Sequence, residues 1–341
     1  MSGTSLDGVD LCYVKFNTEN AEHWSYEILQ AETISYTQNW ELKLKQAIQL
    51  STEDLLSLNS EYGFFLAELV QTFIRKNNIK ELDIIASHGH TVFHQPHRLF
   101  TLQIGDGRAI QQLNKIPVAY DFRSQDVLLG GNGAPLVPIG DEMLFSSYDA
   151  CVNLGGFSNI SFKNNQKRIA FDICPVNIVL NSLALQLGAP YDDKGNWAKK
   201  GNINSEVLYQ LNDLEFYKKN PPKSLGVEWV IAEIQPLLQS LEVHDALATF
   251  TEHIVQQISQ VIQKHQLTKV LFSGGGAYND FLMSKIAEKS QIEIELPSSD
   301  VIQYKEALIF ALMGVLRLLN KNNVLSSATG SRYDHCSGLL V

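Results

Sequence analysis

The first ten residues, Met1-Ser-Gly-Thr-Ser-Leu-Asp-Gly-Val-Asp10, concentrate groups that suit a phosphate in the space of one tight turn. Glycines let backbone N–H groups turn toward a ligand, and two neighbouring hydroxyls add donors. Asp7 would hold the water shell of a magnesium ion, which proteins usually bind through one or two carboxylates plus substrate phosphate. The same residues also suit an ordinary Gly/Asp hairpin turn, so both interpretations stay open.

Three further glycine-rich segments follow apolar stretches. Asn153-Leu-Gly-Gly-Phe-Ser-Asn159 lies between two apolar runs, as a second phosphate-contacting hairpin would. Ser273-Gly-Gly-Gly-Ala-Tyr-Asn279 joins a strand to a helix, and a helix N-terminus with bare backbone suits a nucleotide. Gly130-Gly-Asn-Gly-Ala-Pro135 is a loop at the expected domain junction. Each segment alone is more often a simple turn, but together with the opening motif they predict a nucleotide site.

Composition favours a cytoplasmic enzyme of two domains. A chain of 341 residues that is 45% hydrophobic is too long for one compact core. The net charge of −10 argues against general nucleic-acid binding, which needs a basic face. The four cysteines are scattered and predict reduced thiols rather than a disulfide frame or a zinc site. No targeting core follows Met1, and no apolar run approaches membrane length.

Strand-like and helix-like segments alternate along the chain, which predicts paired α/β domains around a cleft. Short apolar runs predict strands at 9–16, 25–34, 84–87, 100–104, 117–120, 150–154, 159–162, 169–173 and 270–272. Longer periodic runs predict helices at 40–50, 53–77, 178–187, 205–211, 245–265 and 305–319. A polar loop, Gly188–Asn204, separates two of these helices.

A series of motifs in one order resembles the anhydro-N-acetylmuramic acid kinase family, which belongs to the actin/hexokinase/Hsp70-type ATPases. Besides the opening motif and the glycine segments, the resemblance rests on Ser87-His-Gly-His-Thr-Val-Phe-His94, Thr101-Leu-Gln-Ile-Gly105, Asp121-Phe-Arg-Ser-Gln-Asp126, Gly133-Ala-Pro-Leu136, and Phe171-Asp172 with Pro175 and Asn177. It covers nearly the whole chain. The opening motif and the combination are specific, whereas any single piece is not.

The resemblance implies a two-domain actin-like (ribonuclease H-like) ATPase fold with a central cleft. Residues 1–125 and 305–341 would form the first lobe, and residues 126–304 the second. The implied enzyme is an ATP-dependent sugar kinase with an alcohol group as acceptor. It would hydrolyse the 1,6-anhydro ring of anhydro-N-acetylmuramic acid while phosphorylating O6, which yields N-acetylmuramic acid 6-phosphate and ADP. This reaction serves peptidoglycan recycling and amino sugar catabolism, with ATP and Mg²⁺ as cofactors and a homodimer as the expected assembly.

The resemblance also implies site residues. Asp172 matches the catalytic carboxylate that activates water, and Glu306 matches a glutamate near that water. His88, His90, Arg123 and Asp126 match segments on the sugar side, and Asp7 would serve the metal. The nucleotide would contact Gly3, Thr4, Ser5, Leu6, Asp7, Gly8, Val9, Asp10, Gly155, Gly156, Gly274, Gly275, Gly276 and Asn279.

Plainer roles compete with these assignments. Asp172 also suits a strand-end turn, and Glu306 suits a first-turn acid that meets the helix dipole. Arg123 and Asp126 would equally form a surface ion pair.

The chain departs from the family pattern at several positions. The family carries a short apolar strand ahead of the opening motif, so such a strand is expected ahead of Met1. The family's Thr-Gly-Pro-Gly-Asn after the catalytic aspartate is here Ile173-Cys-Pro-Val-Asn177, and His90 and Asn132 stand where glutamine is expected. The residues that differ are expected to line the site, and the differences to affect sugar specificity rather than the ATP-binding fold.

Other functions remain as alternatives. An ordinary hydroxyl sugar kinase of the same fold is the runner-up. His88 and His90 on one face of a strand end, completed by Asp121 and Asp172, would instead suit a metal-dependent hydrolase. A non-catalytic ATP-binding module that grips a partner is a third class. A metal assay tests the hydrolase, and ADP release stimulated by small sugars tests the module.

Overall fold

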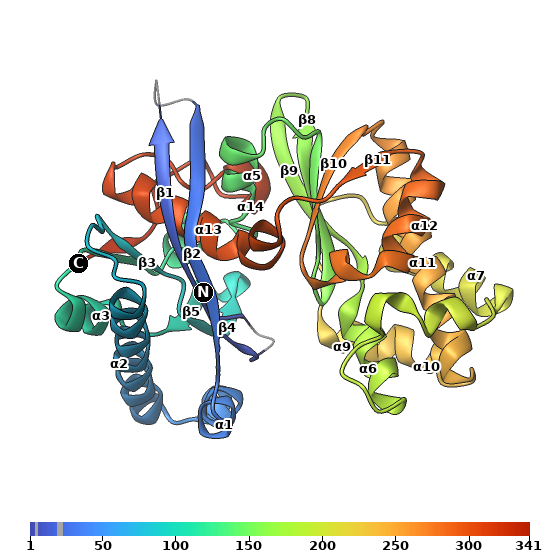
Figure 1. Cartoon of the computed structure of the whole chain (residues 1–341), viewed down its shortest axis with the longest axis horizontal. Coiled ribbons are helices and arrows are strands. Elements are labelled where there is room, and N and C mark those ends of the chain that lie inside the picture. Colours follow the sequence, from blue (N-terminus) through green and yellow to red (C-terminus); the bar gives the residue numbers. More distant parts are fainter. Residues whose placement is uncertain (4–5, 19–22) are drawn as a thin grey trace. The chain divides into compact units, whose positions relative to one another are not determined.

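The computed structural model describes residues 1–3, 6–18 and 23–341, which form two units. Unit 1 comprises Met1–Leu144 and Tyr304–Val341, and unit 2 comprises Phe145–Gln303. The predicted α/β class is confirmed, because each unit combines sheets with helices (Figure 1).

The boundary between the units differs from the one expected at 125/126, because residues 126–144 belong to unit 1. Helix α5 (Pro138–Leu144) lies in this stretch, and α4 (Ser124–Leu128) extends into it. Leu136 and Ile139 pack in one core with Ile309 and Met313 of α13, which runs from Ser299 to Leu318. This apolar packing holds the stretch in unit 1.

The described residues of unit 1 form three sheets of two or three strands each. Strand β1 (Gly8–Thr18) pairs antiparallel with β2 (Trp24–Ser35). A second sheet has the order β12-β6-β3, and β4 pairs with β5. The bounds of these strands are β3 Ile85–Ser87, β4 His90–Gln95, β5 Phe100–Ile104, β6 Val118–Tyr120 and β12 Leu339–Leu340.

The longest helix in the described part of unit 1, α2 (Thr52–Lys76), begins one residue before the predicted start at residue 53. The side chain of Ser51 accepts a hydrogen bond from the backbone N–H of Asp54, and acidic residues fill the first turn. Its apolar face, with Leu58, Tyr62 and Leu66, packs in a core with Val9 of β1. The remaining helices of this unit are α1 (Gln38–Gln46), α3 (Gly107–Asn114) and α14 (Ser326–Thr329).

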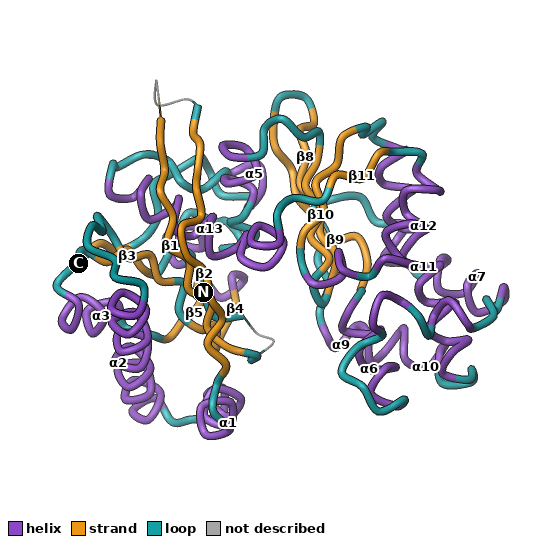
Figure 2. Tube along the Cα trace, viewed as in Figure 1, coloured by secondary structure: helices purple, strands orange, loops and turns teal. Residues whose placement is uncertain are grey.

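Unit 2 has one five-stranded sheet of order β11-β10-β7-β8-β9, drawn as the group of orange strands with α11 and α12 beside it in Figure 2. Strand β8 (Phe157–Asn164) pairs antiparallel with β7 (Ala150–Leu154) on one side and with β9 (Lys167–Pro175) on the other. Strand β10 (Lys269–Ser273) pairs parallel with both β7 and β11 (Glu293–Glu295). The carboxyl ends of β7 and β10 therefore lie at the same sheet edge.

Helix α11 (Val243–Lys264) forms the centre of the unit 2 core. Its buried side chains include Leu247, Phe250, Ile254 and Ile258, which recur at helical spacing. The other helices are α6 (Asn177–Gln186), α7 (Ser205–Asp213), α8 (Glu215–Lys218), α9 (Val227–Trp229), α10 (Gln235–Leu238) and α12 (Asp280–Ser290).

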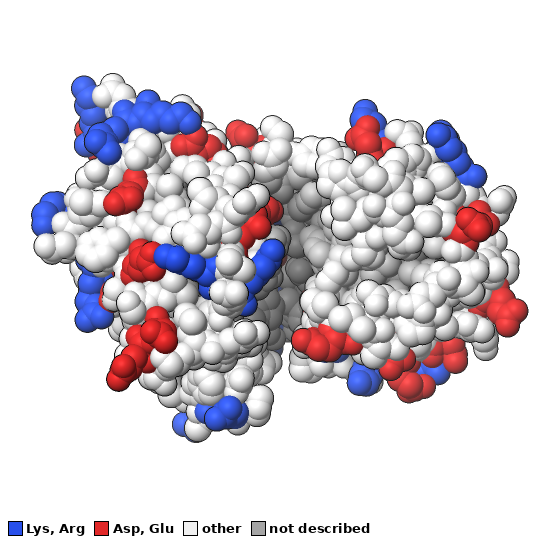
Figure 3. Space-filling view, turned by 90° about the horizontal axis from the view of Figure 1, so that it is seen from below, with Lys and Arg blue, Asp and Glu red and all other residues white. Residues whose placement is uncertain are grey.

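On the face drawn in Figure 3, acidic and basic side chains are scattered among neutral ones rather than gathered by sign. Among the helices of the described residues, none has the length and apolar character needed to cross a membrane. None of the four cysteines forms a disulfide.

A pocket of about 760 Å³ lies within unit 1 between β1, β3, α2 and α13. Leu11, Val14, Ile85 and Phe310 are among its lining residues, so much of the wall is apolar. Beside the pocket, Ser2 pairs antiparallel with Val9, and the N–H of Asp10 donates to the carbonyl of Met1 at 2.8 Å. A segment that continued this pairing would run along β1 into the pocket.

We expect an alternating apolar strand of about five residues, fused ahead of Met1, to raise the thermal unfolding midpoint by about 5 °C. It would bury apolar surface in the pocket and pair with the edge of β1, and paired strand edges aggregate less than open ones. Calorimetry and light scattering measure both effects. An extension of equal length made of Gly and Ser is the control, and equal midpoints for the two extensions would contradict the expectation.

Candidate functional site

The opening motif leads into β1, and its residues differ in how far they are exposed to solvent. Val9 is 2% exposed, packs in the core and pairs with Ile34 of β2, so it presents little surface to a ligand. Asp7 is exposed, and Asp10 is partly buried. The Asp10 carboxylate accepts a hydrogen bond from the Thr33 hydroxyl at 2.6 Å. Thr4 and Ser5 lie outside the described residues.

Arg123 and His88 form a pair in unit 1. The Nε–H of Arg123 donates to Nε2 of His88 at 2.9 Å, so the proton of this imidazole is on Nδ1, which bonds the carbonyl of Gly89 at 2.9 Å. Burial, with the Arg123 charge beside it, holds the pKa of His88 well below its ordinary value. His88 is therefore neutral and orients the guanidinium. Burial lowers the pKa of Arg123 to about 10, which leaves it charged at neutral pH.

His90 contacts a different set of groups from His88. Gly89 between them has φ +72°, a backbone conformation that favours glycine and interrupts the strand alternation. Nδ1 of His90 lies 3.1 Å from the Ser2 hydroxyl, and burial lowers the pKa of His90 to about 4. The two imidazoles therefore have separate hydrogen-bond partners. Within the described part of the chain, no group of three His, Cys, Asp or Glu side chains suits a metal ion.

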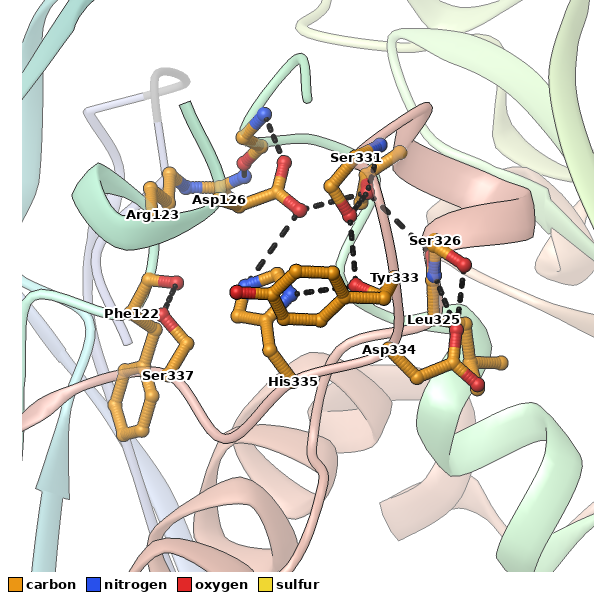
Figure 4. Close-up of polar contacts among 12 residues, drawn as sticks. Phe122, Arg123, Asp126, Leu325, Ser326, Ser331, Tyr333, Asp334, His335 and Ser337 are labelled. Carbon is orange, nitrogen blue, oxygen red and sulfur yellow. Dashed lines mark hydrogen bonds and ion pairs between the residues drawn. The ribbon is translucent and has the colours of Figure 1, made fainter. Parts of the chain in front are cut away.

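Asp126 is not a surface ion-pair partner, because its side chain is 0% exposed. Figure 4 shows its polar contacts. One carboxylate oxygen accepts from the backbone N–H of Gly133 at 2.7 Å, and the other accepts from the Thr329 hydroxyl at 2.7 Å. His335 lies 3.7 Å from the same carboxylate. The Gly133 carbonyl in turn accepts from Nη1 of Arg123 at 2.6 Å. Asp126 thus fixes the loop at Gly133, and the carbonyl of Gly133 in turn fixes the Arg123 guanidinium.

Asp126→Ala is expected to lower the free energy of unfolding by about 2–4 kcal/mol, because two donors lose their acceptor inside the protein. Urea denaturation followed by circular dichroism measures the loss. Asp334→Ala is the matched control: Asp334 also accepts two hydrogen bonds, from the N–H and the hydroxyl of Ser326, but it is exposed. Equal losses in the two variants would show that burial of the Asp126 network adds nothing.

Glu306 lies near the start of α13, next to a buried ion pair. Lys305 pairs with Asp141 of α5 at 2.7 Å, with both side chains buried, and so ties this turn of α13 to α5. Glu306 keeps contact with solvent, yet the surrounding protein desolvates it enough to raise its pKa. The Arg123 charge opposes this rise and the Asp10 charge adds to it. Unit 1 therefore brings Asp10, Arg123 and Glu306 into one electrostatic neighbourhood.

In unit 2 two of the predicted glycine turns lie side by side. Gly274, at φ +82°, lies so close to the turn after β7 that an added Cβ would be 2.6 Å from Oδ1 of Asn153. A Cβ added on Gly276 would be 2.8 Å from Cβ of Leu154. By contrast, the positions of a Cβ on Gly156 and on Gly275 have no neighbour nearer than 3.8 Å. The close approach joins the turns, and the open positions leave backbone accessible to a ligand.

A pocket of about 350 Å³ continues from these turns. Gly275, Gly276 and Asn279 line it, as predicted for a nucleotide wall. The side chain of Asn279 also caps α12, because its Oδ1 accepts from the N–H of Leu282 at 3.0 Å. The sequence reasoning missed several lining residues, namely Asn177, Leu180, Asn181, Tyr191, Asp192, Asp193, Lys194 and Tyr278. The polar composition of the loop 188–204 was the available signal for the middle of this set.

Asp172 lies on β9, in a stretch where the pairing with β8 shifts by one residue. Ser158 faces Cys174 and Asn159 faces Asp172, so Ile173 is the extra residue of a bulge. The carboxylate of Asp172 accepts a hydrogen bond from the N–H of Leu225 at 2.8 Å. Burial raises the pKa of Asp172, and this hydrogen bond opposes the rise.

Most of the residues after Asp172 do not line an open site, in contrast to the sequence-based expectation, although Asn177 lines the 350 Å³ pocket. Ile173, Cys174 and Val176 are at most 1% exposed and belong to the unit 2 core. These side chains replace the threonine and glycines of the family pattern, and they add apolar packing to the core. Asn132 is exposed, whereas His90 is buried.

The amino-acid sequence matches the profile of one protein family over residues 1–340: anhydro-N-acetylmuramic acid kinase. Curated relatives carry the same name. The one from Francisella tularensis subsp. novicida is 33% identical, covering 97% of this chain and 94% of the relative. The one from Sulfurimonas denitrificans is 30% identical, covering 100% and 97%.

Solved structures are more distant. A ROK family glucokinase from Streptomyces griseus, in complex with glucose and AMPPNP, has a TM-score of 0.38 and 10% sequence identity. The match covers 88% of this chain and 97% of the glucokinase. A likeness at this level carries no argument about the site.

Proposed function

Because the chain belongs to the anhydro-N-acetylmuramic acid kinase family, we propose that it opens the 1,6-anhydro ring of that sugar and phosphorylates O6 at the expense of ATP. The observation that carries the proposal is Asp172, a desolvated carboxylate aimed by one backbone N–H. It lies in the same sheet as the paired glycine turns. Its raised pKa makes it a better proton acceptor than an ordinary aspartate.

The nucleotide is proposed to bind in unit 2. The exposed backbone at Gly156 and Gly275 suits the phosphates, and the 350 Å³ pocket suits the nucleoside. Tyr191 and Tyr278 are partly exposed apolar surfaces in this pocket and would contact the base.

A magnesium ion fits the residues of the opening motif. Asp7 presents an exposed carboxylate, Asp10 lies three residues further on, and carboxylate oxygens are preferred ligands of Mg²⁺. The ion, when bound, neutralises phosphate charge during transfer. Asp7 is proposed to orient its water shell.

The sugar is proposed to contact unit 1 through Arg123. Its bonds to His88 and Gly133 use two of its five N–H donors and fix the guanidinium plane. The charge suits the carboxylate of the muramic acid side chain. His90 and Asp126 are bonded inside the protein, so they would support this surface rather than touch the sugar.

In the proposed reaction Asp172 takes a proton from water as the water oxygen bonds to C1. The C1–O6 bond breaks, O6 receives the γ-phosphoryl group, and ADP leaves. Glu306 is proposed as a second carboxylate of this reaction, because its raised pKa also suits proton handling. The homodimer and the cytoplasmic location stay predictions.

Asp172→Asn is expected to lower product formation by about 10²–10⁴-fold while ATP still binds, because an amide cannot accept the proton. Mass spectrometry of the wild-type reaction in ¹⁸O-water tests the route. The label is expected at the anomeric carbon. Label in the phosphate would mean ATP hydrolysis instead, and an unlabelled sugar phosphate would favour the ordinary hydroxyl kinase.

Asp7→Asn is expected to lower turnover by about 10²-fold, because phosphate charge would be poorly neutralised. The fold should be unchanged, since Asp7 is exposed. Coupled ADP assays at saturating magnesium measure turnover, and Glu53→Gln, an exposed acid on α2, is the control. A wild-type rate in Asp7→Asn would remove this role.

A further inference from the structure

A short segment without regular structure, Lys223–Leu225, contacts Asp172 at two points. The N–H of Asp172 donates to the carbonyl of Lys223 at 3.1 Å, and the N–H of Leu225 donates to Oδ2 of Asp172 at 2.8 Å. Strand β9 is the last strand of its sheet, so its outer edge is available for such pairing. The segment therefore holds both the backbone and the side chain of Asp172.

The two ends of this segment are anchored in one aromatic cluster. Phe216 and Tyr217 of α8 precede it, and Trp229 of α9 follows it. The ring of Trp229 lies 5.4 Å from that of Phe216 and 6.0 Å from that of Tyr217. Phe216 is buried, and Tyr217 and Trp229 pack against the unit 2 core. Fixing both ends reduces the freedom of the loop between them.

The side chain of Lys223 adds a third anchor. Its ammonium group donates to the carbonyl of Phe216 at 3.3 Å and lies 4.4 Å from the centre of the Phe216 ring. The lysine thus binds back to α8, while its backbone carbonyl faces Asp172.

We propose that the Lys223–Leu225 segment is a positioning element for Asp172, in which the Leu225 N–H aims the carboxylate and keeps it ionised. The proposal rests on the role of Asp172 given above. Leu225 acts through Asp172, so its backbone is a positioning group and not a catalytic one.

The titratable groups around Asp172 leave the stabilisation of its ionised carboxylate largely to this hydrogen bond. Cys174 on the same strand has its pKa raised by burial to about 12, so it stays a neutral thiol. Burial also raises the pKa of Tyr217 well above its ordinary value. Lys223, whose pKa is lowered by burial, holds its ammonium group against the α8 rings. Since burial of Asp172 disfavours its charge, a donor on Oδ2 is needed to offset that cost.

The test replaces the amide N–H of Leu225 with an ester oxygen, by incorporating the hydroxy acid analogue of leucine at position 225 in the full chain. Leucine incorporated in the same way is the control. Carbon-13 NMR of the Asp172 carboxyl and the pH profile of kcat are both measured. The ester is expected to raise the Asp172 pKa, and with it the acid limb of kcat, by about one to two pH units.

Each outcome separates the two proposals. An unchanged NMR pKa in the ester protein overturns the positioning role. A raised NMR pKa with an unmoved acid limb upholds the hydrogen bond and overturns Asp172 as the base.

Lys223→Met gives an independent check through the side-chain anchor: kcat should fall about tenfold with the KM for ATP unchanged. Lys219→Met, an exposed lysine of the same loop, should match the wild type; equal kcat in both variants would contradict the anchor.

Discussion

The parallel pairing of β7 with β10 is the constraint on which the unit 2 site depends. Parallel strands end at the same sheet edge, so the turns after Leu154 and after Ser273 must meet, although more than a hundred residues separate them in the sequence. At that edge Gly274 and Gly276 touch the β7 turn, while Gly156 and Gly275 stay open. The same glycine composition therefore performs two tasks. Two of these residues permit close packing, and two expose backbone.

In unit 1 the constraint is different, because charged side chains are buried and their polar atoms need hydrogen-bond partners inside the protein. Arg123 is oriented by a neutral histidine and by the Gly133 carbonyl, and the loop bearing Gly133 is held by Asp126. The C-terminal region completes the network through Thr329. A buried carboxylate is tolerable only when its oxygens are bonded, as they are here. The cost of burial explains why residues from distant segments converge on Asp126.

The departures from the family pattern after Asp172 become intelligible in the core. A bulge places Ile173 and Cys174 inside in succession, and Val176 follows them. Apolar side chains at these positions contribute burial of roughly 25 cal/mol per Å² to unit 2. The divergence thus concerns packing behind the carboxylate. Its aim is set by the neighbouring segment at Leu225.

The sequence by itself determined the element types, the glycine turns, the family and the candidate carboxylates, because strand and helix periodicity and turn chemistry are local. It could not decide which side chains face a ligand. Asp126 was expected to contact the sugar, with a surface ion pair as the alternative, and its side chain is fully buried. His88 and His90 were also considered as a metal-binding pair, and each has its own hydrogen-bond partner. Residues 126–144 joined the other unit because Leu136 and Ile139 pack against α13. These outcomes depend on contacts between segments far apart in the chain, and only the tertiary structure supplies them.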